Sequence, residues 1–304
     1  MLDFSRIRTY PLRERKNLVR RRDFRRASTD VEPWGDRRFR RLVRLIQEAR
    51  AGGRHVLWQM GAHVIKTGQS LLVIDLIRRG AVTHVAMNGA CTIHDYEMAL
   101  IGETSEDVAL SIEDGSFGMA EETGRDINEA INSSREGYGK ALGRWIVERA
   151  LPHRDYSILA AAFDCGVPAT VHVAIGTDIT HQHPTCDGAR LGAATYEDFK
   201  VYTETVSQLA GGVLLNVGSA VIMPEVFLKA LSIARNLGFP VAPLTTANLD
   251  CRRHINDYYF RPAKNVVKRP ISLGGQGFNL RVAHEVSIPS LHKLLTGGKR
   301  LRAR

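Results

Sequence analysis

The sequence predicts a doubly wound α/β fold, in which a mostly parallel sheet carries helices on both faces. Short apolar runs rich in β-branched residues alternate with segments of helical periodicity from residue 37 to residue 244. Each apolar run ends in a corner of small or polar residues, as parallel strands do where they turn into helices. With 304 residues, 44% of them hydrophobic, the chain can bury a sizeable core in one main domain.

Charge divides the chain into a basic N-terminal arm, residues 1–36, and a body, residues 37–304. Residues 1–44 hold 15 Lys and Arg against 6 Asp and Glu, and the tail at 299–304 is also basic. The rest of the body is slightly acidic, which argues against a surface that binds nucleic acid along its whole face. We interpret the arm as solvated or as docked on a neighbouring subunit.

Neither a membrane span nor a disulfide framework is expected. The longest apolar runs, residues 70–77 and 212–217, are too short to cross a bilayer, and no signal-peptide pattern opens the chain, so the sequence predicts a cytoplasmic protein without a membrane partner. The four cysteines are scattered without a C-x-x-C pair, which favours reduced thiols.

The body opens with an amphipathic helix from Arg37, which a glycine pair ends at residues 52 and 53. A strand over residues 55–59, a helix that ends at Gly80 and a strand over residues 83–87 then form a β-α-β unit with an expected right-handed crossover.

The rest of the chain repeats this alternation. The sequence predicts helices over residues 95–101, 121–150 with a break near residue 137, 157–165, 195–210, 224–237 and 289–295, and strands over residues 169–174, 212–217 and 241–244. Residues 111–118 form either a loop or a short hairpin, and the glycine-rich run at residues 274–277 is predicted to be a flexible loop.

The corner after the strand at residues 83–87 gathers ionisable side chains. His94, Asp95 and Glu97 follow Asn88 and Gly89 at the start of a helix. Ligands bind at the carboxyl ends of parallel strands, where helix N-termini favour anions. The simpler alternative is that Asp95 caps its own helix and Glu97 belongs to an acidic first turn.

Two further corners are candidates for nucleotide contacts. No G-x-G-x-x-G follows a predicted strand. The corner Gly218-Ser219-Ala220 follows a buried strand and precedes a helix, which suits phosphate, although a tight turn explains it equally well. T-T-A-N-L-D, residues 245–250, follows another predicted strand, where a carboxylate can hold ribose hydroxyls or an amine.

The loop I-G-T-D-I-T-H-Q-H-P-T-C-D raises the alternative of a metal-dependent enzyme. His181, His183, Cys186 and Asp187 are metal-ligand types, and three ligands with a water would suit metal-assisted hydrolysis. The spacing matches no standard zinc signature, and a polar turn explains the loop as well, so we assign no metal ligand.

The order and spacing of the corners after about residue 54 resemble the deoxyhypusine synthase family. The likeness joins the family's Thr-Ser-Asn corner to G-A-H-V-I-K-T-G, its Ile-Pro strand and Asp-Gly-Ser turn to V-P-A-T-V-H-V-A-I-G-T-D, its triple-glycine corner to L-N-V-G-S-A-V-I-M-P-E, and its Thr-Ala-x-x-x-Asp nucleotide corner to T-T-A-N-L-D.

This resemblance implies a Rossmann-like fold with an N-terminal extension, NAD as cofactor, and a homotetramer with active sites between subunits. The implied reaction is NAD-dependent transfer of an aminobutyl-type group from a polyamine, such as spermidine or an agmatine-like amine, to an amine acceptor. Carboxylates would bind the ammonium groups, a base would take a proton, and a lysine would carry the imine.

The implied site residues follow from the matched positions. By this resemblance the catalytic residues would be His94, Asp95, Glu97 and Lys268, and the NAD contacts would be His63, Asn88, Gly89, Gly176, Gly218, Ser219, Thr246 and Asp250. The family's paired glutamates fall on Ile93 and His94, and its Trp-Gly-Lys is replaced by R-P-A-K-N-V-V-K-R-P-I, where Lys264 or Lys268 offers an amine. The acceptor chemistry is therefore expected to diverge. A third alternative is a non-enzymatic binding protein whose basic arm docks on RNA or another anionic partner.

Overall fold

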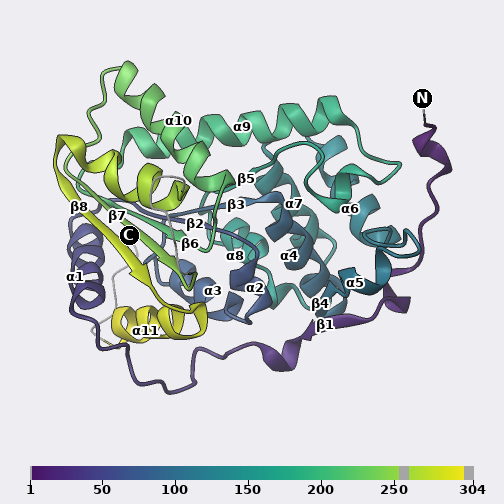
Figure 1. Ribbon diagram of the computed structural model, residues 1–304, viewed down its shortest axis with the longest axis horizontal. Coiled ribbons are helices and arrows are strands. Elements are labelled where there is room, and N and C mark those ends of the chain that lie inside the picture. Colours follow the sequence, from purple (N-terminus) through teal and green to yellow (C-terminus); the bar gives the residue numbers. More distant parts are fainter. Residues whose placement is uncertain (1, 253–259, 298–304) are drawn as a thin grey trace.

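The computed structural model describes residues 2–252 and 260–297 and confirms the doubly wound α/β fold (Figure 1). Its main sheet has six parallel strands in the order β5-β3-β2-β6-β7-β8. They are β2 (Val56–Met60), β3 (His84–Asn88), β5 (Ala169–His172), β6 (Val213–Val217), β7 (Leu244–Asp250) and β8 (Gly275–Arg281). Counted along the chain from β2, this order reads 3-2-1-4-5-6, the order of the Rossmann fold.

Helices cover both faces of this sheet, as Figure 1 shows with α9 and α10 on one side and α1, α3 and α11 on the other. In the described part of the chain, the α-helices longer than four residues are α1 (Arg37–Ala51), α3 (Ser70–Arg78), α4 (Gly89–Ile101), α6 (Glu121–Asn132), α7 (Tyr138–Glu148), α8 (Ile158–Asp164), α9 (Gly188–Ser207), α10 (Ile222–Asn236) and α11 (His284–Thr296). The buried apolar side chains form one cluster on each face, and every residue of β2, β5 and β6 is buried, as in parallel sheets covered on both sides.

A helix protects the free edge of β5. The carboxylate of Asp198 in α9 accepts a hydrogen bond from the backbone N–H of Val171 at 2.7 Å. The hydroxyl of Thr195 donates to the carbonyl of Val171 at 2.8 Å and accepts from the N–H of Val173 at 3.3 Å. Side chains of α9 thus take the place of a neighbouring strand and leave this stretch of backbone satisfied.

A row of amide side chains, buried at Gln59, Asn216 and Asn248 and exposed at Asn279, crosses four strands on the α9 and α10 face. Gln59, Asn216, Asn248 and Asn279 are register partners, and each amide hydrogen-bonds to the next at 2.8 to 2.9 Å. Asn216 also donates to the carbonyl of Ser219 at 2.9 Å. The row therefore fixes the strand register and holds the turn that follows β6.

The N-terminal arm packs on its own chain rather than extending into solvent. β1 (Asn17–Arg20) pairs antiparallel with β4 (Glu103–Glu106), a strand that was not predicted. Leu12 and Phe24 are buried, and Arg15 forms a buried ion pair with Glu97. The domain boundary at residue 36 stays a prediction, and the basic tail lies outside the described residues.

Several predicted boundaries were wrong. The strand predicted at residues 241–244 is β7, which runs through T-T-A-N-L-D instead of ending before it. Its polar composition hid it, because Asn248 belongs to the amide row. The predicted loop at residues 274–277 contains the start of β8, and α4 begins at Gly89 rather than at Asp95. Thr92 and Ile93 are tolerated in this helix because both pack in the interior.

The shorter segments complete the chain. α5 (Val108–Ser111) ends at the first residue of the stretch 111–118, and the rest of that stretch forms turns, which is the loop alternative and not the hairpin. α2 (His63–Lys66) follows β2 after a short turn. The other predicted elements coincide with observed ones, although α9 and α11 begin several residues before their predicted starts. No helix in the described part of the chain is long and apolar enough to cross a membrane.

Candidate functional site

The carboxyl ends of β2 and β6 form the switch point of the sheet, because the strand order changes direction between them. Here the backbone N–H of Gly61 donates to the carbonyl of Val217 at 3.1 Å. A Cβ atom on Gly61 would lie 2.7 Å from the carbonyl oxygen of Gly218, and Gly218 itself has φ +73°. Only glycine fits both positions, so the turns after β2 and β6 pack backbone against backbone and form the floor of the switch point.

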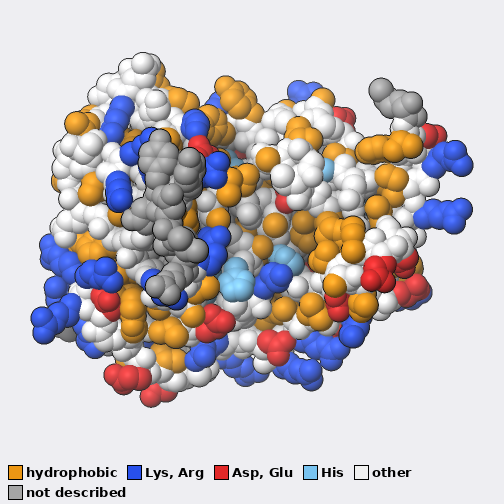
Figure 2. Space-filling view, in the orientation of Figure 1, with side chains coloured by type: hydrophobic (Ala, Val, Ile, Leu, Met, Phe, Trp, Pro, Cys, Tyr) orange, Lys and Arg blue, Asp and Glu red, His pale blue; other side chains and the backbone are white. Residues whose placement is uncertain are grey.

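Two histidines stand beside this floor. His63 begins α2 and is exposed, His284 begins α11 and is 3% exposed, and their ring centroids lie 5.3 Å apart. Nε2 of His284 lies 3.4 Å from the carbonyl oxygen of Leu249, and no described residue hydrogen-bonds to its buried Nδ1. Burial lowers the pKa of His284, which keeps the ring neutral and able to accept a hydrogen bond. Figure 2 shows histidine and cationic side chains together in the hollow near the middle of this face.

A second polar group lies at the ends of β3 and β5. Nδ1 of His181 accepts from the backbone N–H groups of Gly176, at 3.0 Å, and Asp178, at 3.2 Å, so the neutral ring carries its proton on Nε2. That Nε2 lies 3.7 Å from Oδ2 of Asp178. Neither atom has a hydrogen-bond partner among the described residues, although both side chains are more than 90% buried.

The electrostatics of this pair follow from burial beside α4. A Cβ on Gly89 would lie 2.0 Å from Oδ2 of Asp178, so the carboxylate rests against the first residue of the helix. Burial raises the pKa of Asp178 to about 6 and lowers the pKa of His181. A buried carboxyl group that titrates near neutrality, with an unused oxygen, is a candidate for proton transfer.

The structure brings most of the predicted NAD residues to this edge of the sheet. His63, Asn88, Gly89, Gly176, Gly218 and Ser219 lie in or directly after strand ends. Thr246 does not, because it is the third residue of β7, and the four residue steps from it to Asp250 correspond to about 13 Å along a strand. Asp250 ends β7 and pairs with Arg252. The prediction that both belong to one corner was wrong because the strand was placed too early.

The acidic residues of the α4 corner make contacts within the chain. Asp95 is fully buried and accepts from Ser157 Oγ and from the backbone N–H groups of Ile158, at 2.7 Å, and Leu159, at 3.2 Å. It therefore caps α8 and not its own helix. Burial raises the pKa of Asp95 to about 6, although these hydrogen bonds act in the opposite direction and lower it. Glu97 pairs with Arg15, and both carboxylates are thereby used in holding the fold.

His94 and Lys268 lie apart from each other. Nδ1 of His94 hydrogen-bonds to the hydroxyl of Thr104 at 2.7 Å, and burial lowers its pKa to about 4. Lys268 is exposed at the end of η6 (Pro262–Lys268), two residues before Pro270, whose carbonyl accepts from Arg235 near the end of α10. The chain runs from the end of η6 through a short turn into the amino end of β8. Lys268 therefore lies toward the edge of the sheet opposite the switch point.

The histidine loop does not assemble a metal site. Among the described residues, no three His, Cys, Asp or Glu side chains are grouped to hold an ion. His181 faces Asp178, whereas His183 contacts Thr185 at 2.7 Å and Glu121 at 3.3 Å. These residues are close in the sequence, which motivated the metal-dependent alternative, but their side chains do not face a common point in the structure.

Fold and crevice together define the class: an α/β protein with the Rossmann strand order and a glycine-floored switch point flanked by buried titratable groups. No family model and no curated protein matches the chain.

Solved structures do match. The chain resembles AgrE in ternary complex with ornithine and NAD+ (TM-score 0.55, 14% identity, 88% of this chain and 34% of that one) and a conserved LOR/SDH protein from Methanococcus maripaludis S2 (0.53, 16%, 89% and 73%). It also resembles a protein assigned as a deoxyhypusine synthase from Entamoeba histolytica (0.53, 8%, 85% and 87%). At these identities the likeness establishes a shared fold. The chain spans about a third of the length of AgrE and of the arginine dihydrolase ArgZ.

Proposed function

We propose that this chain is an NAD-dependent enzyme that oxidises an amine carbon of a polyamine, a guanidino-amine or a basic amino acid. The observation that carries the proposal is the set of buried, unpartnered polar atoms beyond the carboxyl ends of the strands: Nδ1 of His284 near the switch point, and the facing atoms of Asp178 and His181 at the ends of β3 and β5. Buried polar groups without partners are rare in folded proteins and mark places where a ligand supplies the missing hydrogen bonds.

The crevice residues fit a dinucleotide. Gly61 and Gly218 let the turns after β2 and β6 pack against each other and against His284, and Asn216 holds the turn at Ser219. A pyrophosphate would lie against the backbone of these turns, at the N-terminal ends of the helices that follow them. The ring of His63 would contact the ligand from the exposed side, and Nδ1 of His284 would accept a hydrogen bond from a ribose hydroxyl or an amide. Bound NAD+ supplies an acceptor for a hydride from the amine carbon.

The substrate side of the proposal rests on Asp178 and His181. Oδ2 of Asp178 would take the proton that the amine releases as its carbon is oxidised to an imine. Nε2–H of His181 would donate to a polar atom of the substrate and keep it between the two side chains. Among the fold relatives, AgrE has been solved with ornithine and NAD+ and with L-arginine, which supports an amine-bearing substrate.

The narrower reaction, transfer of an aminobutyl-type group to an amine acceptor, needs a lysine near the oxidised carbon. Lys268 lies toward the opposite edge of the sheet. We therefore limit the proposal to amine oxidation with release or onward reaction of the imine. The homotetramer and the cytoplasmic location stay predictions.

The His63→Ala variant tests the cofactor site. We expect it to bind NAD+ about tenfold more weakly than the wild-type chain, which corresponds to about 1.4 kcal/mol, because the exposed ring that would contact the ligand is removed. Isothermal titration calorimetry measures the change. His153→Ala, which removes a histidine next to Arg21 on the surface, is the matched control and should leave NAD+ affinity unchanged. Absence of NAD+ binding by the wild-type chain would overturn the proposal.

A further inference from the structure

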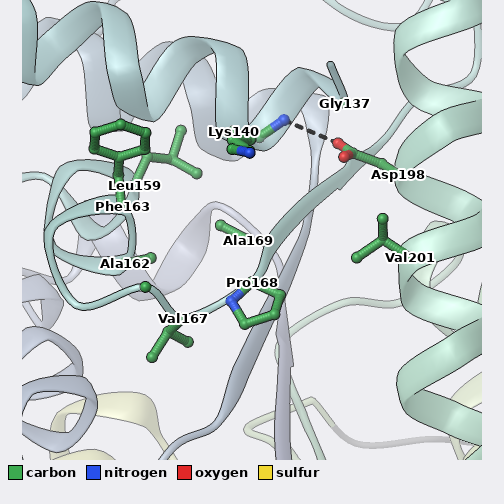
Figure 3. Close-up of a pocket in the computed structure, with 12 residues that line it drawn as sticks. Gly137, Lys140, Leu159, Ala162, Phe163, Val167, Pro168, Ala169, Asp198 and Val201 are labelled. Atoms are coloured by element: carbon green, nitrogen blue, oxygen red, sulfur yellow. Dashed lines mark hydrogen bonds between the residues drawn. The ribbon is translucent and has the colours of Figure 1, made fainter.

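A cavity lies at the amino end of β5, at the other end of this strand from Asp178 and His181 (Figure 3). Its volume is about 370 Å³, which is in the range of small-molecule sites. The apolar wall comes from α8, the segment before β5, and α9, and it includes Leu159, Phe163, Val167 and Val201.

One carboxylate faces this apolar space. Figure 3 shows Asp198 reaching from α9 toward the start of α7, near the labelled Gly137. Oδ2 of Asp198 accepts from the backbone N–H of Gly139 at 2.9 Å and of Val171 at 2.7 Å. No described residue donates a hydrogen bond to Oδ1. The side chain is nevertheless 2% exposed, and burial raises the pKa of Asp198 to about 7.

The glycines at the start of α7 make room for this carboxylate. A Cβ on Gly137 would lie 1.9 Å from Oδ1 of Asp198, and a Cβ on Gly139 would lie 2.1 Å from the carbonyl oxygen of Ala169. Glycine at position 137 therefore lets Oδ1 rest against the backbone at the start of α7. The nearest lysine of the lining, Lys140, pairs with Glu136 at 2.7 Å, so its charge is already compensated.

We propose that this cavity binds a small ligand that carries one ammonium group on an apolar body. The ammonium group would hydrogen-bond to Oδ1 of Asp198, and the apolar body would lie against Leu159, Phe163 and Val201. A buried carboxylate with an unused oxygen is stabilised by a cation that brings its own donors. The site is separate from the crevice, because strand β5 lies between them, and it does not depend on the proposed function.

Thermal shift and calorimetry with 3-methylbutylamine, leucine and 3-methylbutan-1-ol test the site. We expect the amine to stabilise the full chain and the alcohol, which has the same apolar body without a charge, to have no effect. Binding of leucine would identify an amino acid as the source of the ammonium group, and binding of the amine alone would identify a simple amine. Both ammonium compounds are tested up to about 10 mM, a concentration that would detect even a weak ligand. If neither of them binds, the proposal is overturned.

Two variants assign the binding to this cavity. Asp198→Asn keeps an oxygen that accepts from Gly139 and Val171 but removes the charge, and Val201→Phe fills the space from the exposed side of α9. Each is expected to weaken amine binding by about tenfold or more. Val108→Phe, at another exposed valine, is the control. His63→Ala should bind the amine as the wild type does. If Asp198→Asn and Val201→Phe also bound the amine with wild-type affinity, the proposal would be overturned.

Discussion

The Asp178→Asn variant is expected to oxidise amines about 10²- to 10³-fold more slowly than the wild-type chain, because an amide cannot accept the proton that the substrate releases. The size of the side chain and its position against Gly89 are retained. The measurement is the rate of NADH formation, followed by absorbance, with spermidine, agmatine and ornithine as substrates.

The pH dependence of the wild-type rate gives an independent reading of the same group. Burial raises the pKa of Asp178 to about 6, so the carboxyl group is protonated and inactive as a base below that pH. We therefore expect the rate to rise as the pH increases through about 6 and the residual rate of Asp178→Asn to lack this limb. A low-pH limb that persists in the variant would assign the titration to another residue.

Asp187→Asn is the matched control for this substitution. Asp187 lies in the same loop and caps α9 through the backbone N–H groups of Ala189 and Arg190, a role that asparagine fills equally well. The control should retain its rate, and both variants should retain NAD+ affinity and melting temperature. An unchanged rate in Asp178→Asn would remove this carboxylate from the mechanism.

The fold could be predicted from the sequence because its main strands are apolar and glycines mark their ends. β2 and β6 are buried on both faces, and so they read as continuous apolar runs. β7 could not be read in this way. Its buried Asn248 is satisfied by Asn216 and Asn279, which lie more than 30 positions away in the sequence. Local pattern contains no signal for such partners.

The sequence predicted where the candidate site lies in the fold better than it predicted which residues form it. The strand-end corners with His63, Gly89 and Gly218 lie at the switch-point edge as expected. Asp95 and Glu97 carry charge near a corner, but Ser157 and Arg15, which are distant in the sequence, account for their positions. The importance of Asp178 and His181 depends on burial without partners, which only the three-dimensional structure shows. In the sequence, the loop that contains His181 suggested a metal site instead.

Glu97→Ala is expected to lower the free energy of unfolding by about 3–5 kcal/mol, the usual cost of leaving one member of a buried ion pair alone. Oε2 of Glu97 lies 2.7 Å from Nη2 of Arg15, which is 8% exposed. The same carboxylate accepts from the hydroxyls of Thr104, at 2.6 Å, and Thr123, at 2.9 Å. The substitution leaves the guanidinium with Glu106, 4.0 Å away, as its remaining ion-pair partner. Thermal unfolding should show a decrease on the order of 10 °C.

The double variant Arg15→Met with Glu97→Leu separates the ion pair from the packing around it. It removes both charges and retains apolar volume, so it should recover much of the stability that Glu97→Ala loses. Because Arg15 lies in the arm, Glu97→Ala should also speed tryptic cleavage between residues 20 and 26, where arginines are concentrated, and the double variant should reverse this effect. Cleavage at the wild-type rate in Glu97→Ala would show that β1 and β4, rather than this ion pair, hold the arm on the body.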